Sequence, residues 1–77
     1  MELEQFNIKN NFIFDLKFND GFITTIDMAN LLQNKVTLDE LKTARIDKEW
    51  GCLEFKDGMV DIEPKTLYKY ATKTDNK

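Results

Sequence analysis

Residues 12–27 read FIFDLKFNDGFITTID, a pattern that predicts a β-hairpin. Over residues 12–18 a large apolar side chain occupies every second position, which is typical of a strand with one buried face. A second strand, rich in β-branched residues, is expected over residues 22–27. Between them, Asn19-Asp20-Gly21 contains the glycine that a tight turn with a positive φ requires.

The length of this loop determines which side chains face each other across the hairpin. A two-residue loop would place Asp15 opposite Ile26. A three-residue loop, with Gly21 in the left-handed region, instead brings the larger apolar side chains together. We therefore expect the three-residue loop, in which the facing pairs are Phe18 and Phe22, Leu16 and Thr24, and Phe14 and Ile26.

Shorter elements are expected on both sides of the hairpin. Asp27 suits the N-cap of a helix, and Thr37 and Glu40 fit a capping box. Asp57-Gly58 indicates a second hairpin, and Pro64 suits the first turn of a helix. The expected elements are, in chain order, an edge strand over 3–8 with Glu4, Phe6 and Ile8 on one face, a helix over 28–32, helical turns over 37–43, an extended segment over 45–47, a turn over 48–51, strands over 52–55 and 59–62, and a helix over 64–71.

The two hairpin sequences resemble each other. Residues 16–23 align with residues 53–60 at an offset of 37, and each copy precedes a helical stretch. Two hairpin-helix units would produce this similarity, and so would any two Asp-Gly turns with apolar flanks. In either case we expect an α+β fold, a mostly antiparallel sheet of about five or six short strands with short helices covering one face.

The length and composition of the chain limit the classes of function. Its 77 residues suit a single domain, with an ordered core over about 3–71 and a polar C-terminal tail over 72–77. The formal net charge is −3, and a negative protein is repelled by the negative phosphates of nucleic acid, so no direct nucleic-acid binding is expected. Without histidine, and with Cys52 as the one cysteine, the chain has no Cys/His zinc site and no Ser-His or Cys-His catalytic pair. A single thiol fits a reducing compartment, and no secretory signal or membrane span is recognisable, so we expect a cytoplasmic protein.

A set of motifs spread over about residues 6–70 carries a family resemblance. The motifs are residues 18–27, Leu31-Leu32, residues 44–47, Gly51, residues 53–55, Asp57-Gly58 and residues 61–68 with their Pro-x-x-Leu-Tyr ending. On these motifs the chain resembles the small bacterial proteins of the domain-of-unknown-function family DUF2442. Members of that family often have Trp-Pro before an Asn-Gly turn, where this chain has Phe55-Lys56-Asp57-Gly58.

The resemblance implies a compact α+β domain without an established enzymatic activity. Such proteins are often encoded beside another small protein, which suggests antitoxin-like or regulatory pairing. Some longer relatives continue into a helix-turn-helix, for which this chain has no room, so the resemblance does not imply operator binding.

Candidate partner-binding residues lie in the acidic second half of the chain. The segment from Arg45 to Glu63 has six acids and three bases, a local charge of −3. Such a segment can attract a basic partner, and it can equally be ordinary solvated surface. Trp50 either binds a partner or covers the small core. The candidate partner-binding residues are Trp50, Glu54, Asp57, Asp61 and Glu63.

No catalytic, cofactor-binding or metal-binding residues are expected. Asp57, Asp61 and Glu63 could supply an oxygen-only metal site, but the ligand spacing of an EF-hand is absent. Cys52 should point to the same side of its strand as Glu54, where nearby acids would raise the pKa of the thiol. A structural thiol is therefore expected rather than a reactive one.

Taken together, these features predict a non-enzymatic protein-interaction module that binds and restrains or regulates a partner protein with a basic surface, in an antitoxin-like manner. One alternative is a small acidic phage or mobile-element inhibitor of a host nucleic-acid enzyme, which would be anti-CRISPR-like. A second alternative is a small metal-dependent hydrolase. No cofactor and no membrane association are expected, and a homodimer could form through the edge strand over residues 3–8.

Overall fold

A computed structural model describes residues 1–75, with side-chain surroundings for residues 1–73. The elements in chain order are β1 (Leu3–Asn10), β2 (Ile13–Phe18), β3 (Ile23–Asp27), α1 (Ala29–Leu32), a 3-10 helix η1 (Asp39–Thr43), β4 (Arg45–Ile46), β5 (Leu53–Phe55), β6 (Val60–Ile62) and α2 (Pro64–Asp75). Strands β1, β2 and β3 form one antiparallel sheet, here called sheet A, and β4, β5 and β6 form a second, sheet B. The expected α+β class and antiparallel pairing are confirmed, but the strands are divided between two sheets instead of forming one.

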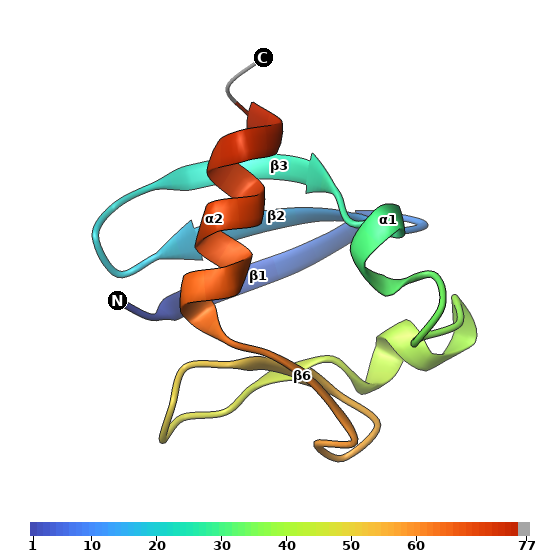
Figure 1. Cartoon of the computed structure of the whole chain (residues 1–77). Coiled ribbons are helices and arrows are strands. Elements are labelled where there is room, and N and C mark those ends of the chain that lie inside the picture. Colours follow the sequence, from blue (N-terminus) through green and yellow to red (C-terminus); the bar gives the residue numbers. More distant parts are fainter. Residues whose placement is uncertain (76–77) are drawn as a thin grey trace.

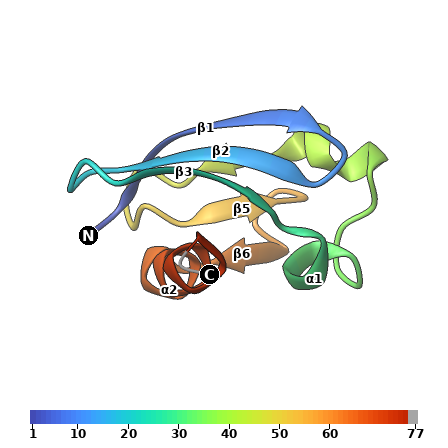
Figure 2. The ribbon, with the colours of Figure 1, turned by 90° about the horizontal axis from the view of Figure 1, so that it is seen from above.

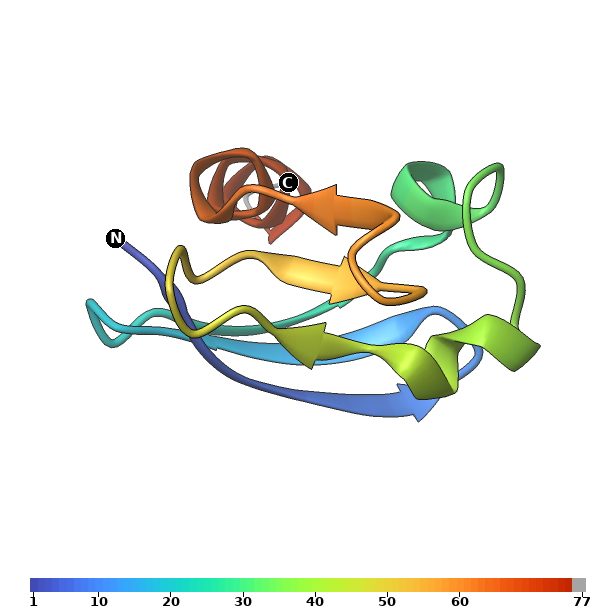
Figure 3. The same ribbon diagram turned by 90° about the horizontal axis from the view of Figure 1, so that it is seen from below.

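The two sheets and helix α2 surround a common core. In Figure 1, α2 crosses in front of the strands of sheet A, and sheet B lies along the β1 side of that sheet. Figure 2 shows β5, β6 and α2 on the same side of sheet A. In Figure 3, sheet B extends away from sheet A, from β4, which contacts β1, to β6, which lies beside α2. Each sheet has one apolar face, and this arrangement lets the two faces and the helix bury one another.

The first hairpin has the predicted register. Phe14 pairs with Ile26, and Leu16 pairs with Thr24. The Phe18 N–H donates to the Phe22 carbonyl oxygen at 2.9 Å, which leaves a three-residue loop. Gly21, the last residue of that loop, has a φ of +95°, in the left-handed region that glycine adopts without strain.

Strand β1 differs from its predicted alternation at its first residues. The pairing register shifts between Leu3 and Gln5, so Glu4 is an extra residue of a β-bulge. Leu3 therefore points into the core with half-buried Phe6 and Ile8, and Glu4 is exposed. The prediction that Glu4 shares the face of Phe6 and Ile8 is wrong, because the bulge changes which side each residue faces.

Side-chain hydrogen bonds form at the start of both short helices, but the cap positions are Met28 and Leu38, one residue after the predicted Asp27 and Thr37. The Ala29 N–H donates to Asp27 Oδ1 at 2.9 Å, one residue before the cap position itself, which Met28 occupies. The Thr37 N–H donates to Glu40 Oε1 at 3.0 Å, and the Glu40 N–H donates to Thr37 Oγ1 at 3.2 Å. These reciprocal bonds are those of a capping box, and they join Thr37 to Glu40 in the first turn of a single 3-10 helix, η1.

The second hairpin repeats the first with a longer loop. Leu53 pairs with Ile62 and Phe55 with Val60, so residues 56–59 form a four-residue loop. Equivalent residues of the two hairpins are therefore 37 positions apart up to the turn glycine and 38 positions apart in the second strand of each hairpin. Each sheet is a three-stranded meander followed by a helical segment, so the similarity between the halves extends to their element order.

Helix α2 joins the two halves through one apolar face. Leu67 and Ala71 are fully buried in the core, and α2 continues to Asp75, beyond the predicted end at residue 71. Of the predicted polar tail over 72–77, residues 76–77 lie outside the described residues. The buried core consists of Leu3, Phe14, Leu16, Phe18, Ile26, Met28, Leu32, Val36, Leu41, Leu53, Phe55, Ile62, Leu67 and Ala71. Among residues 1–75, no helix has the length and apolarity that a membrane span requires.

Candidate functional site

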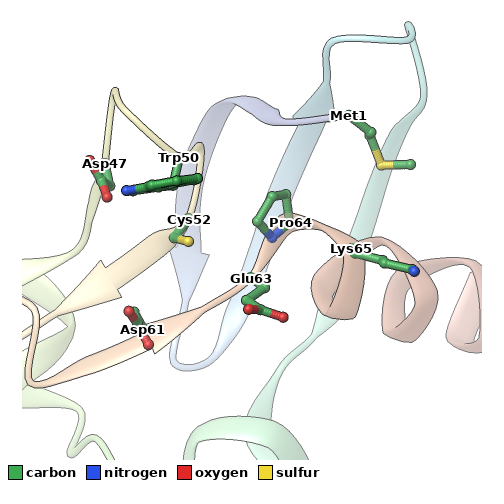
Figure 4. A pocket seen from close by; sticks show the side chains of 8 residues that line it. All are labelled: Met1, Asp47, Trp50, Cys52, Asp61, Glu63, Pro64 and Lys65. Atoms are coloured by element: carbon green, nitrogen blue, oxygen red, sulfur yellow. The ribbon is translucent and has the colours of Figure 1, made fainter.

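A surface pocket of about 600 Å³ lies at one end of sheet B (Figure 4). Its lining combines an aromatic ring, a thiol and three carboxylates. We call it the Trp50 pocket, and its lining residues are Met1, Asp47, Trp50, Cys52, Asp61, Glu63, Pro64 and Lys65.

The alternation of side chains along sheet B places most of this lining on one face. Leu53 and Ile62 pair with each other and face the core, so their neighbours in sequence face outward. Cys52 precedes Leu53, whereas Asp61 and Glu63 flank Ile62. The same rule puts Glu54, which pairs with Asp61, on this outer face.

Trp50 lies in a loop that packs closely on Glu2 and is stabilised by hydrogen bonds of its own. The Asp47 N–H donates to the Cys52 carbonyl oxygen at 2.9 Å, and the Gly51 N–H donates to the Asp47 carbonyl oxygen at 2.6 Å. Asp47 Oδ1 also accepts the Glu49 N–H at 3.0 Å. These three hydrogen bonds fix the backbone of residues 47–52, whereas the Trp50 side chain is 68% exposed.

The pocket has a negative electrostatic character. Its lining includes the acids Asp47, Asp61 and Glu63 and one basic side chain, that of Lys65. Burial raises the pKa of the Cys52 thiol, and the negative charges of Asp61, Asp47 and Glu63 raise it further. The thiol is therefore protonated at neutral pH, which agrees with the expected structural cysteine and not with a nucleophile.

The structure brings together three of the five candidate partner-binding residues. Trp50, Asp61 and Glu63 line the same pocket. Glu54 is buried and accepts a hydrogen bond from Arg45 Nε at 2.8 Å, so its charge is matched within the fold. Asp57 is exposed in the loop over residues 56–59, outside the pocket lining.

Sequence reasoning did not identify the other residues of the pocket. The period of two places Cys52 and Glu54, and likewise Asp61 and Glu63, on one side of a strand. Assigning Asp47 to that side requires the pairing of β4 with β5, which brings Arg45 opposite Glu54. Met1, Pro64 and Lys65 reach the pocket only because the start of the chain and the start of α2 lie close to the β4–β5 loop, and no local pattern indicates this.

The pocket is not arranged as a metal site. Within the part of the chain that the structure describes, no group of three or more His, Cys, Asp or Glu side chains is close enough to hold a metal ion. The set Asp57, Asp61 and Glu63 is accordingly not assembled. The dispersed carboxylates and the indole ring are instead suited to binding an organic cation.

The comparisons with known proteins assign the chain to a family. Neither the curated proteins nor the solved structures provided a match to this chain. A family model described as "Protein of unknown function (DUF2442)" matches residues 4–73, which include β1 from its second residue, the other five strands and most of α2. The chain therefore belongs to the DUF2442 family of proteins of unknown function.

Proposed function

We propose that this protein is a non-enzymatic interaction module that binds a partner protein with a basic surface and thereby restrains or regulates it. The observation that carries the proposal is the Trp50 pocket, where an exposed tryptophan stands beside acids that take part in none of the ion pairs found among the described residues.

Exposure of Trp50 supports a binding role rather than a core role. A side chain of this size that only covered the core would be mostly buried, whereas Trp50 is 68% exposed. Its loop is held by the backbone bonds of Asp47 and Gly51, so binding would order few additional backbone groups. Tryptophans of this kind are enriched among the residues that dominate interface energies.

The charge of the pocket supports a basic partner. The ion pairs found among the described residues use Glu4, Asp39, Glu40 and Glu54 as their acids. None of these pairs involves an acid of the Trp50 pocket, so Asp47, Asp61 and Glu63 keep their negative field at the surface. Such a field accelerates association with a positively charged surface and disfavours acidic partners.

The proposal is tested by charge reversal in the pocket with a matched control elsewhere. Asp61→Lys with Glu63→Lys changes the pocket, and Glu4→Lys with Asp39→Lys makes the same change in net charge at exposed positions outside it. Each purified variant is first checked for folding by circular dichroism. Each is then used to capture proteins from the native host, and the protein encoded beside this chain is tested first as a purified partner.

We expect the wild-type chain and the control to retain the same basic protein in a fixed stoichiometry. The pocket variant should lose at least about tenfold in affinity, because attraction becomes repulsion at the contact. Equal affinity of all three chains for the partner would contradict the proposal. Displacement of the captured partner by nucleic acid would show that the partner binds nucleic acid through the same surface and would favour the inhibitor form of this function.

A further inference from the structure

We propose that the Trp50 pocket receives the side chain of an arginine from the partner, with the guanidinium stacked on the Trp50 indole and directed toward Asp61 and Glu63. This inference rests on the proposed function and specifies the chemical group that the pocket recognises.

The first support is the position of the indole. In Figure 4 the Trp50 ring is seen edge-on above Cys52, with Asp61 and Glu63 on the far side of Cys52. A group that enters between them would meet the face of the ring on one side and carboxylates on the other. Tryptophan is the best of the aromatic side chains at attracting a cation to its face.

The second support is the set of acids that surrounds the Cys52 thiol in the lining of the pocket. Cys52 is only 8% exposed, and its sulfur points into the pocket. Three acids of the lining act on it from different segments, namely Asp47 after β4, Asp61 in β6 and Glu63 before α2. Their fields thus converge on the volume that a ligand would occupy.

The third support is the size and spread of the site, which favours arginine over other cations. No three acidic or thiol ligands are close enough for one metal ion among the residues described. A volume of about 600 Å³ is within the range of sites that hold small molecules, and it accommodates a long side chain with part of its backbone. Arginine has a planar guanidinium that stacks on aromatic rings and donates to two carboxylates, whereas the lysine ammonium is compact and strongly hydrated.

The fluorescence of Trp50 provides a direct test, because it is the one tryptophan of the chain. Three short peptides that differ at one position, carrying arginine, lysine or citrulline, are titrated into the protein at low salt. Citrulline has nearly the shape of arginine without its charge. We expect a saturable change with the arginine peptide, a roughly tenfold weaker one with lysine and no saturation with citrulline.

Two double variants test whether the change in Trp50 fluorescence depends on the acids of the pocket. Asp61→Asn with Glu63→Gln should abolish saturation by the arginine peptide, and Glu4→Gln with Asp39→Asn should leave it unchanged. The chemical shift of the Trp50 indole N–H, followed by NMR in the same titrations, gives a second readout that does not depend on quenching.

Equal responses to the arginine and citrulline peptides, or no saturable response to arginine, would overturn this inference. The proposed function has its own separate test in the capture of the partner by the lysine variants. A partner that is lost on charge reversal, together with a pocket that does not prefer arginine, would retain the interaction module and reject the arginine site.

Discussion

Gly51 is buried at the base of the β4–β5 loop and has a φ of +75°. A Cβ atom at this position would lie 2.6 Å from Glu2 Cβ, closer than side-chain atoms approach each other. The absence of a side chain therefore allows the loop that carries Trp50 to pack on Glu2, the residue before β1. At the scale of single residues, the position of the Trp50 loop depends on this close approach, and so therefore does the binding surface that we propose.

Gly51→Ala should lower the free energy of unfolding by about 3 kcal/mol, from the left-handed backbone and the clash with Glu2 together. The matched control is Gly21→Ala, where φ is +95° but no atom lies within 4 Å of the added Cβ. There only the backbone conformation is strained, and we expect a loss of about 1 kcal/mol. Urea unfolding of the two variants measures both, and equal losses would show that Glu2 yields without cost.

At the scale of elements, two tyrosine hydroxyls connect helix α2 to the first hairpin by hydrogen bonds, one to the loop before β3 and one to the last residue of β3. The Tyr68 hydroxyl donates to Asp20 Oδ2 at 2.8 Å, and the Tyr70 hydroxyl donates to the Asp27 carbonyl oxygen at 3.0 Å. The Tyr68 ring also packs edge-on against Phe18, with ring centroids 4.9 Å apart. These contacts hold the C-terminal helix on sheet A although it follows sheet B in sequence.

The Tyr68–Asp20 bond predicts a dependence of stability on pH at both extremes. The Phe22 N–H and the Tyr68 hydroxyl lower the pKa of Asp20 below its ordinary value of 3.8, so this stabilisation is complete above that pH and is lost as the pH falls through the lowered value. The same bond raises the pKa of Tyr68 above its ordinary value of 10.0, so its stabilisation is complete below pH 10.0 and is lost as the pH rises through the raised value.

Tyr68→Phe removes this bond while keeping the ring in place. Urea unfolding over a series of pH values should show that the variant loses the alkaline decline due to Tyr68 and has a shallower acid decline. Part of the acid decline should remain, because hydrogen bonds also lower the pKa of Asp15 and Glu40. A pH profile identical to that of the wild type would mean that the bond contributes nothing in solution.

At the scale of the whole molecule, the two sheets depend on each other for burial. The Phe14 and Phe55 rings, one from each sheet, pack edge-on with centroids 6.3 Å apart, and both residues are fully buried. A domain of this size has a stability of only about 3–5 kcal/mol. Neither half could bury its apolar face without the other, so we expect the chain to unfold in one step.

Phe55→Ala should cost about 3–5 kcal/mol, which is close to the whole stability, and should leave the chain largely unfolded. Phe55→Leu keeps most of the apolar volume, so it should cost less than about 1.5 kcal/mol and remain folded. In this milder variant, Trp50 fluorescence reports on sheet B and far-ultraviolet circular dichroism reports on the whole backbone. Two separate transitions would contradict the shared core.

The parts of the fold that were predicted correctly are those governed by neighbours in sequence. The register of the first hairpin follows from the period of two and from Gly21, and the capping box follows from the spacing of Thr37 and Glu40. The error at Glu4 came from a bulge, which depends on how β1 fits its neighbours and has no local signal here. The division into two sheets was missed because alternation identifies strands without saying which sheet they join.

In the candidate site, too, some features follow from the local sequence and others only from the tertiary structure. By itself the sequence determined the charge, the lack of histidine, the turn around Trp50 and the alternation that sets Asp61 and Glu63 on one face, whereas the exposure of Trp50 is known only from the structure. Only the tertiary structure decided that Glu54 is matched by Arg45, that Asp57 stands apart, and that Asp47, Met1 and Lys65 join Trp50 around one pocket. The physical reason is that backbone alternation and turn geometry act over a few residues, whereas a pocket forms where burial of a common core brings distant segments together.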